Sequence, residues 1–251
     1  MGQKVLITSI GRTATSSLNA LLNQLPNVSS YHERGTGDPY FLCLSRYSAY
    51  QNFCKDYLNS RDLLANKSEA EFYVEVNPYF RFADVDHLKS LGWNIIFLVR
   101  HPKTYLESVF NRALFTDHDR SFQKLPSQSD PFYDNWDTSS RFEKLCWYYH
   151  DVHTHILAKN QPIITYESLS EGVGLAQLLE QIGLNTKVDR LRLPYLNKSE
   201  AHNKRQFLRK LLGRPTNMGA QLQWTSLSAQ ELNTYQKLCK PLITKLGYEL
   251  Q

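Results

Sequence analysis

The sequence predicts an α/β fold built on an open, mostly parallel sheet. Short apolar runs rich in β-branched residues alternate with longer stretches of helical periodicity, which is typical of this class. The run Asn94 to Val99 is continuously apolar, as expected of a central parallel strand buried on both faces. The 251 residues, with 41% apolar and 12% aromatic side chains, suffice for the core of a single domain over residues 1–251.

Composition excludes several function classes. No apolar run reaches membrane-spanning length and the N-terminal run reads as a core strand, so we expect a cytoplasmic protein without a transmembrane segment or signal peptide. Cys43, Cys54, Cys146 and Cys239 have no CxxC spacing, which predicts neither a zinc site nor a redox pair. The formal charge of +5 suits a small polyanionic ligand and is too diffuse for nucleic acid.

Strands and helices follow one another along the whole chain. The predicted strands are Lys4–Ser9, Val28–Glu33, Phe72–Val76 and Asn94–Val99. The predicted helices are Thr15–Leu25, Tyr40–Leu64, Phe82–Leu91, one that begins at Pro102, Phe142–Ile156, and a closing helix that Ser228 and Glu231 cap.

The turn after the first strand is the first candidate site. Small residues, hydroxyls and one arginine join the strand to the next helix, in the order Gly11, Arg12, Thr13, Ala14, Thr15, Ser16 and Ser17. Small side chains let backbone N–H groups approach an anion, and the helix N-terminus adds its partial positive charge. The alternative is an ordinary strand-to-helix turn capped by Thr13 or Thr15.

This turn does not match a nucleoside-triphosphate loop. That loop requires G-x-x-x-x-G-K-[ST], and the segment contains no Gly-Lys pair. The lysine for the β- and γ-phosphates is therefore missing, together with the hydroxyl residue after it that would hold magnesium.

A second candidate site follows the strand Asn94–Val99. Arg100 lies at the carboxyl end of this strand, and Ser108 lies eight residues later, about two turns into the next helix. An arginine and a hydroxyl in these positions can hold one phosphate between them. The alternative is a solvated arginine and a neutral helix serine.

These two segments resemble sulfotransferases that use 3'-phosphoadenosine 5'-phosphosulfate (PAPS). The stretch from Arg12 to Ser16 resembles their 5'-phosphosulfate loop, with arginine for the usual lysine and Ala14 for the usual glycine. The Arg100-x7-Ser108 spacing matches their 3'-phosphate clamp. The resemblance implies a three-layer α/β/α fold related to P-loop proteins, PAPS as co-substrate, 3',5'-ADP as product, and no metal.

Two later segments extend the resemblance over nearly the whole chain. Residues 162–169 resemble the family's strand followed by Tyr-Glu-Asp-Leu, with Ser168 for aspartate, so Tyr166 would contact the adenine. Residues 223–231 resemble its Trp-x-x-x-Leu-Ser-x-x-Glu segment. Seven residues before Trp224 the family carries Arg-Lys-Gly for the 3'-phosphate, whereas this chain has Asn217-Met218-Gly219. The glycine is retained and both charges are lost; possible replacements are Lys204, Arg205, Arg209 and Arg214.

Sulfuryl transfer needs donors for the leaving phosphate and a base for the acceptor proton. The resemblance gives the first role to Arg12 and the turn that follows it. For the base, Glu33 at the end of the second strand comes first, Glu75 second, and His32 is a third candidate that strand alternation directs to the opposite face from Glu33. The alternative for each carboxylate is a structural salt bridge.

Other features of the sequence are less informative about function. His150, His153 and His155 lie in an amphipathic segment and predict a surface helix rather than a metal site. Residues 115–140 form a candidate acceptor lid or an ordinary surface loop.

The acceptor hydroxyl could belong to a small molecule, a glycan or a lipid. The rival functions are a P-loop small-molecule kinase and an inactive protein that binds 3',5'-ADP or PAPS.

Overall fold

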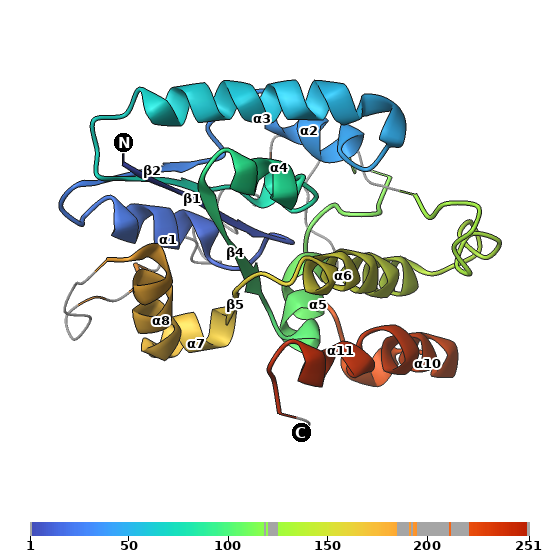
Figure 1. The fold of residues 1–251 in the computed structure, drawn as a ribbon. Coiled ribbons are helices and arrows are strands. Elements are labelled where there is room, and N and C mark those ends of the chain that lie inside the picture. Colours follow the sequence, from blue (N-terminus) through green and yellow to red (C-terminus); the bar gives the residue numbers. More distant parts are fainter. Residues whose placement is uncertain are drawn as a thin grey trace. The chain divides into compact units, whose positions relative to one another are not determined.

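A five-stranded parallel sheet forms the centre of this computed structural model (Figure 1). The structure describes residues 2–117, 119, 125–184, 191, 193–194, 211 and 221–249. The strands are β1 Gln3–Ser9, β2 Val28–His32, β3 Phe72–Val76, β4 Trp93–Val99 and β5 Ile163–Thr165. Their spatial order is β2-β3-β1-β4-β5, and every neighbouring pair is parallel. The predicted α/β class and parallel sheet are confirmed.

Strand β1 is held on both sides. Val5 pairs with Val74 of β3 and with Asn94 of β4, and the ladder with β4 continues to Ser9 and Leu98. All residues of β1 from Val5 onward are buried, as expected for a strand covered on both faces. Because parallel strands end at the same edge, the segments that follow the five strands meet there.

The contacts divide the chain into two compact units. The first contains Met1–Arg100 and His155–Leu196, and the second contains His101–Thr154 and Asn197–Gln251. The first unit holds the sheet and most helices: α1 Thr15–Leu22, α2 Asp38–Leu44, α3 Gln51–Asn66, α4 Val85–Ser90, α7 Tyr166–Glu171 and α8 Val173–Ile182, with short 3-10 turns η1 Ser48–Tyr50 and η2 Pro78–Phe80.

Helices cover both faces of the sheet in the first unit (Figure 1). Leucines of α1 and α8, such as Leu18 and Leu178, pack with Val74 and Val76 in one core. Glu75 lies between these two valines and therefore points to the opposite face, where it pairs with Arg61 of α3. The unit thus has a helix layer, the sheet and a second helix layer.

In the described part of the second unit, the regular elements are all helices. It contains α5 Pro102–Phe110, most of α6 Arg141–Ala158, the 3-10 turn η4 Trp224–Ser226, α10 Ala229–Leu238 and α11 Lys240–Lys245. The predicted capping box is confirmed: Glu231 N donates to Ser228 Oγ, and Ser228 N donates to Glu231 Oε2. Within the described ranges, no helix is both long and apolar enough to cross a membrane.

One predicted helix is wrong. Instead of a single helix from Tyr40 to Leu64, the chain forms α2, the turn η1 and then α3. The break occurs at Tyr47, whose backbone is extended with φ −112° and ψ 125°. The irregular pattern of apolar residues in this stretch allows such a break, because no continuous stripe requires one helix.

A buried ion pair joins α3 to the sheet. Arg61 Nε donates to Glu75 Oε1 at 3.0 Å and Arg61 Nη2 donates to Oε2 at 2.7 Å, while the Tyr73 hydroxyl donates to Oε1 at 2.9 Å. The side chains of Arg61 and Glu75 are 5% and 1% exposed. Burial raises the pKa of Glu75, and the hydrogen bonds and charge of Arg61 oppose this rise. Removal of either Arg61 or Glu75 would destabilise the fold, because the remaining charge would be buried without a partner.

We predict that Arg61→Met lowers the free energy of unfolding by about 3 kcal/mol at neutral pH, because Glu75 then lacks its counter-charge. Without Arg61 the folded-state pKa of Glu75 lies further above its unfolded value, so protonation relieves the loss. The loss should therefore shrink as the pH falls toward about 4, the ordinary carboxyl pKa. Urea denaturation at several pH values measures it, with Lys67→Met at the exposed end of α3 as control. Equal losses in the two variants would contradict the prediction.

Candidate functional site

The loop after β1 has an unusual backbone. Gly11, Arg12 and Ala14 all have positive φ, at 92°, 61° and 58°. Gly11 N donates to Ser9 Oγ at 3.0 Å, which closes the first part of the turn. A left-handed conformation costs a residue with a Cβ about 1–2 kcal/mol, so Arg12 and Ala14 are strained. Turns that mix left- and right-handed residues direct successive N–H groups to one side and form anion-binding concavities.

Among the described residues, no side chain caps the N-terminus of α1. The first turn of this helix contains no acidic residue. The hydroxyl Oγ1 of Thr13 is fully buried and has no hydrogen-bond partner within the described part of the chain. The Oγ1 of Thr8 in β1 is likewise fully buried and without a hydrogen-bond partner among the described residues. Uncapped donors at a helix N-terminus, together with a buried unpaired hydroxyl, are what a bound oxyanion would satisfy.

Arg100 connects the end of β4 to this loop. Its Nη1 donates to the backbone oxygen of Arg12 at 2.8 Å. Its guanidinium carbon lies 4.4 Å from the ring centroid of Tyr166, the first residue of α7. Three predicted site residues from distant parts of the sequence are thus brought together, and two of them are cations beside the uncapped helix.

His32 and Glu33 meet the same helix from β2. His32 Nε2 lies 3.0 Å from Thr15 Oγ1 and 3.5 Å from Ser16 Oγ, both in the first turn of α1. It also lies 3.6 Å from Glu33 Oε1. The expectation that His32 and Glu33 point to opposite faces is therefore wrong. Glu33 has φ 47° and has left the strand conformation, so alternation no longer applies to it.

Tyr79 lies near the carboxylate of Glu33, and the sequence analysis did not single it out as a site residue. Burial and the negative charge of Glu33 raise the pKa of the Tyr79 hydroxyl. Arg81, two residues later, is also buried and donates from Nη1 to the backbone oxygens of Ser9 and Pro78. Both residues follow β3 and therefore lie at the carboxyl edge of the sheet. This position in the sequence could have identified them as candidate site residues.

Glu75, the second candidate for the base, has a different role. Arg61 and Tyr73 occupy both of its carboxylate oxygens, and its side chain is only 1% exposed. A general base must come within hydrogen-bond reach of the proton that it removes. Glu75 is therefore corrected to a structural carboxylate, and the candidates for the base are Glu33 and His32.

Other predicted residues lie on helices or outside the described residues. Ser108 is half-buried on α5, in the second compact unit. Ser17 is buried in α1. The segment 217–219, with Gly219, and the four basic residues considered as replacements for its lost charges lie outside the described residues. The 3'-phosphate clamp remains a prediction.

The described part of the candidate lid is rich in aromatic contacts. The ring of Trp136 lies 5.5 Å from that of Phe115 and 5.1 Å from that of Trp147. Trp147 Nε1 also donates to Asp130 Oδ2 at 2.8 Å. These contacts explain how the segment packs in the second unit, and its role as an acceptor lid stays a prediction.

The histidine segment is helical, as predicted, and forms α6, but the expectation of a surface helix is wrong at His153. His153 is fully buried, and its Nδ1 lies 2.8 Å from the backbone oxygen of Tyr149. Among the described residues, no three His, Cys, Asp or Glu side chains are grouped so that they could hold a metal ion.

Comparison with known proteins finds similar folds and no sequence relative. The structure resembles mouse sulfotransferase SULT7A1 complexed with PAP, at 12% identity over 94% of this chain and 82% of that chain, with a TM-score of 0.45. It also resembles the sulfotransferase domain from the curacin biosynthetic pathway, at 13% identity over 100% of this chain and 99% of that chain, with a TM-score of 0.47. No family model and no curated protein matches the sequence. At such identities the likeness concerns the fold and assigns neither ligand nor activity.

We predict that Thr13→Val leaves the ligand-free protein as stable as the parent or more stable by about 1 kcal/mol, because the lost hydroxyl is buried without a partner. The matched change Thr15→Val should cost about 1 kcal/mol, because it removes the contact with His32. Urea denaturation without ligand compares the two. A loss in Thr13→Val as large as in Thr15→Val would mean that the Thr13 hydroxyl already serves the fold.

Proposed function

We propose that this chain is a sulfotransferase that moves the sulfuryl group of PAPS to a hydroxyl of an acceptor. The observation that carries the proposal is the buried, unpartnered hydroxyl of Thr13 beside the uncapped N-terminus of α1. Arg12 and Arg100 at the same edge supply the positive charge that a phosphosulfate requires. The residue order of the loop, with arginine and small hydroxyl residues and no Gly-Lys pair, favours a phosphosulfate over a nucleoside triphosphate.

The loop fits the sulfated end of this co-substrate. When bound, PAPS supplies a sulfuryl group activated by its bond to the 5'-phosphate. The N–H groups and hydroxyls from Thr13 to Ser17 would hold the phosphate oxygens, and Arg12 would stabilise charge at the bridging oxygen. Preorganised donors of this kind act at little cost in reorganisation, and the positive φ of Arg12 and Ala14 is the backbone geometry that would direct them to one side.

The rest of the nucleotide site is assigned by resemblance. Arg100 and Ser108 would bind the 3'-phosphate, Tyr166 would contact the adenine, and Gly219 would belong to the C-terminal part of the same site. The cation–π contact between Arg100 and Tyr166 supports a shared site for these two residues. The contact of Arg100 with the Arg12 carbonyl would couple the 3'-phosphate site to the transfer loop.

Glu33 is the proposed base. Its carboxylate is 38% exposed, so an acceptor can reach it, and its Oε1 would take the proton from the acceptor hydroxyl. His32 lies between Glu33 and the hydroxyl of Thr15 and would orient the carboxylate or take the proton itself. The acceptor class is a hydroxyl of a small molecule, a glycan or a lipid.

Two other functions remain as outcomes of the test. A P-loop kinase would need a Gly-Lys pair followed directly by a magnesium-binding Ser or Thr, and the loop contains no Gly-Lys pair. A protein that binds PAPS or 3',5'-ADP without transfer is favoured by one observation, the loss of both charges at Asn217 and Met218.

We predict that Glu33→Gln slows sulfate transfer by about 10²- to 10⁴-fold, the usual contribution of a general base, and leaves the affinity for 3',5'-ADP unchanged. Release of 3',5'-ADP from PAPS is measured with 4-nitrophenol and with glucose as probe acceptors. Glu69→Gln, an exposed carboxylate in the same unit, is the control.

Full turnover in Glu33→Gln would move the base to His32. Tight 3',5'-ADP binding by the parent without transfer to any acceptor would favour the inactive binding protein. Magnesium-dependent transfer from ATP would assign the chain to the kinases.

A further inference from the structure

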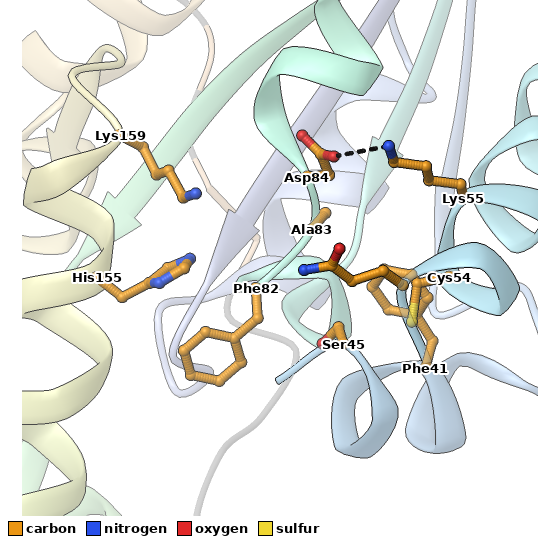
Figure 2. A pocket seen from close by; sticks show the side chains of 10 residues that line it. Phe41, Ser45, Cys54, Lys55, Phe82, Ala83, Asp84, His155 and Lys159 are labelled. Carbon is orange, nitrogen blue, oxygen red and sulfur yellow. Dashed lines mark ion pairs between the residues drawn. The ribbon is translucent and has the colours of Figure 1, made fainter. Parts of the chain in front are cut away.

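A pocket of about 340 Å³ lies in the first compact unit. Its walls come from α2, α3, the segment that joins η2 to α4, and the end of α6 (Figure 2). None of the residues assigned to the anion loop, to the base or to the nucleotide lines it. Its volume falls in the range of sites for small molecules.

The pocket carries more positive than negative charge. Lys159, just beyond α6, forms no ion pair with any carboxylate in the described part of the chain. Lys55 is 4.0 Å from Asp84, and both side chains are nearly half exposed. Such a long surface pair contributes little, so Lys55 can turn to another anion at small cost. Figure 2 shows Lys55 and Lys159 approaching the pocket from opposite sides.

The inner wall is aromatic and fixed. The guanidinium carbon of Arg46 lies 4.1 Å from the ring centroid of Phe82, and the ring of His155 meets Phe82 edge-on at 4.9 Å. Phe41 is fully buried and offers no surface to a ligand, and it supports the wall through an edge-on contact with Phe80 at 4.9 Å. A rigid apolar wall opposite movable ammonium groups fits a ligand with an apolar body and an anionic end.

We propose that this pocket binds a small organic anion, with an aromatic ring against Phe82 and a carboxylate between Lys159 and Lys55. Charge complementarity selects the anion, because two ammonium groups face a single carboxylate, Asp84. The ring of Phe82 in the pocket wall favours a ligand that carries an aromatic ring. The proposal is independent of the sulfotransferase assignment, since it uses none of the same residues.

The test is a calorimetric titration of the full chain with phenylacetate, with phenylacetamide as a neutral analogue of the same shape. Phenylacetate should bind saturably and phenylacetamide should not. Lys159→Gln should weaken phenylacetate binding about tenfold or more, since it removes a charged hydrogen-bond donor. The matched control is Lys89→Gln, an exposed lysine of α4 outside the pocket, which should bind as the parent does.

Three results would overturn the proposal: no saturable phenylacetate binding, equal binding by Lys159→Gln and the parent, or equal binding of phenylacetamide. The titration is repeated in saturating 3',5'-ADP, where phenylacetate affinity should stay the same. Displacement by the nucleotide would assign the anion to the nucleotide site instead. Failure of 3',5'-ADP to bind at all would count against the sulfotransferase assignment and leave this pocket unaffected.

Discussion

The arrangement of the site depends on the parallel pairing of β1 with both β3 and β4. Because these strands end at one edge, the loop after β1, Arg81 after β3 and Arg100 after β4 converge there. Arg81 and Arg100 then bind backbone oxygens of Ser9 and Arg12. A shift of β1 by one residue would turn its buried side chains to the other face and separate these contacts.

A buried polar network supports the same edge from α2 and α3. Asp38 is fully buried and accepts hydrogen bonds from Gly35 N, the Tyr57 hydroxyl and Asn77 Nδ2. It therefore ties the turn that follows Glu33 to the segment that follows β3. Complete satisfaction of such a network makes its geometry unique, which would suit the role of base proposed for Glu33. The exposed Glu33 thus rests on a turn whose anchors are buried.

Local pattern predicted the strands well and the side-chain partners poorly. Apolar runs identified β1, β3 and β4, because burial on both faces leaves a strong signal, whereas the short strand β5 was indicated by the family resemblance. The alternation argument failed at Glu33, since its positive φ is a backbone property that residue type does not reveal. The structural role of Glu75 depends on Arg61, a partner on a different element. Residue types singled out the loop after β1 as a candidate anion site, whereas the contact of Arg100 with the Arg12 carbonyl required the fold.

The central claim is that this edge binds a nucleotide with a 3'-phosphate, and calorimetric titration without magnesium tests it most directly. Purified protein is titrated with 3',5'-ADP, 5'-AMP and ATP. The account predicts that 3',5'-ADP binds at least about tenfold more tightly than 5'-AMP, because the extra phosphate meets charge-assisted donors, and that Arg100→Ala removes most of this difference. Equal affinity for 3',5'-ADP and 5'-AMP, or binding of ATP alone once magnesium is added, would contradict it.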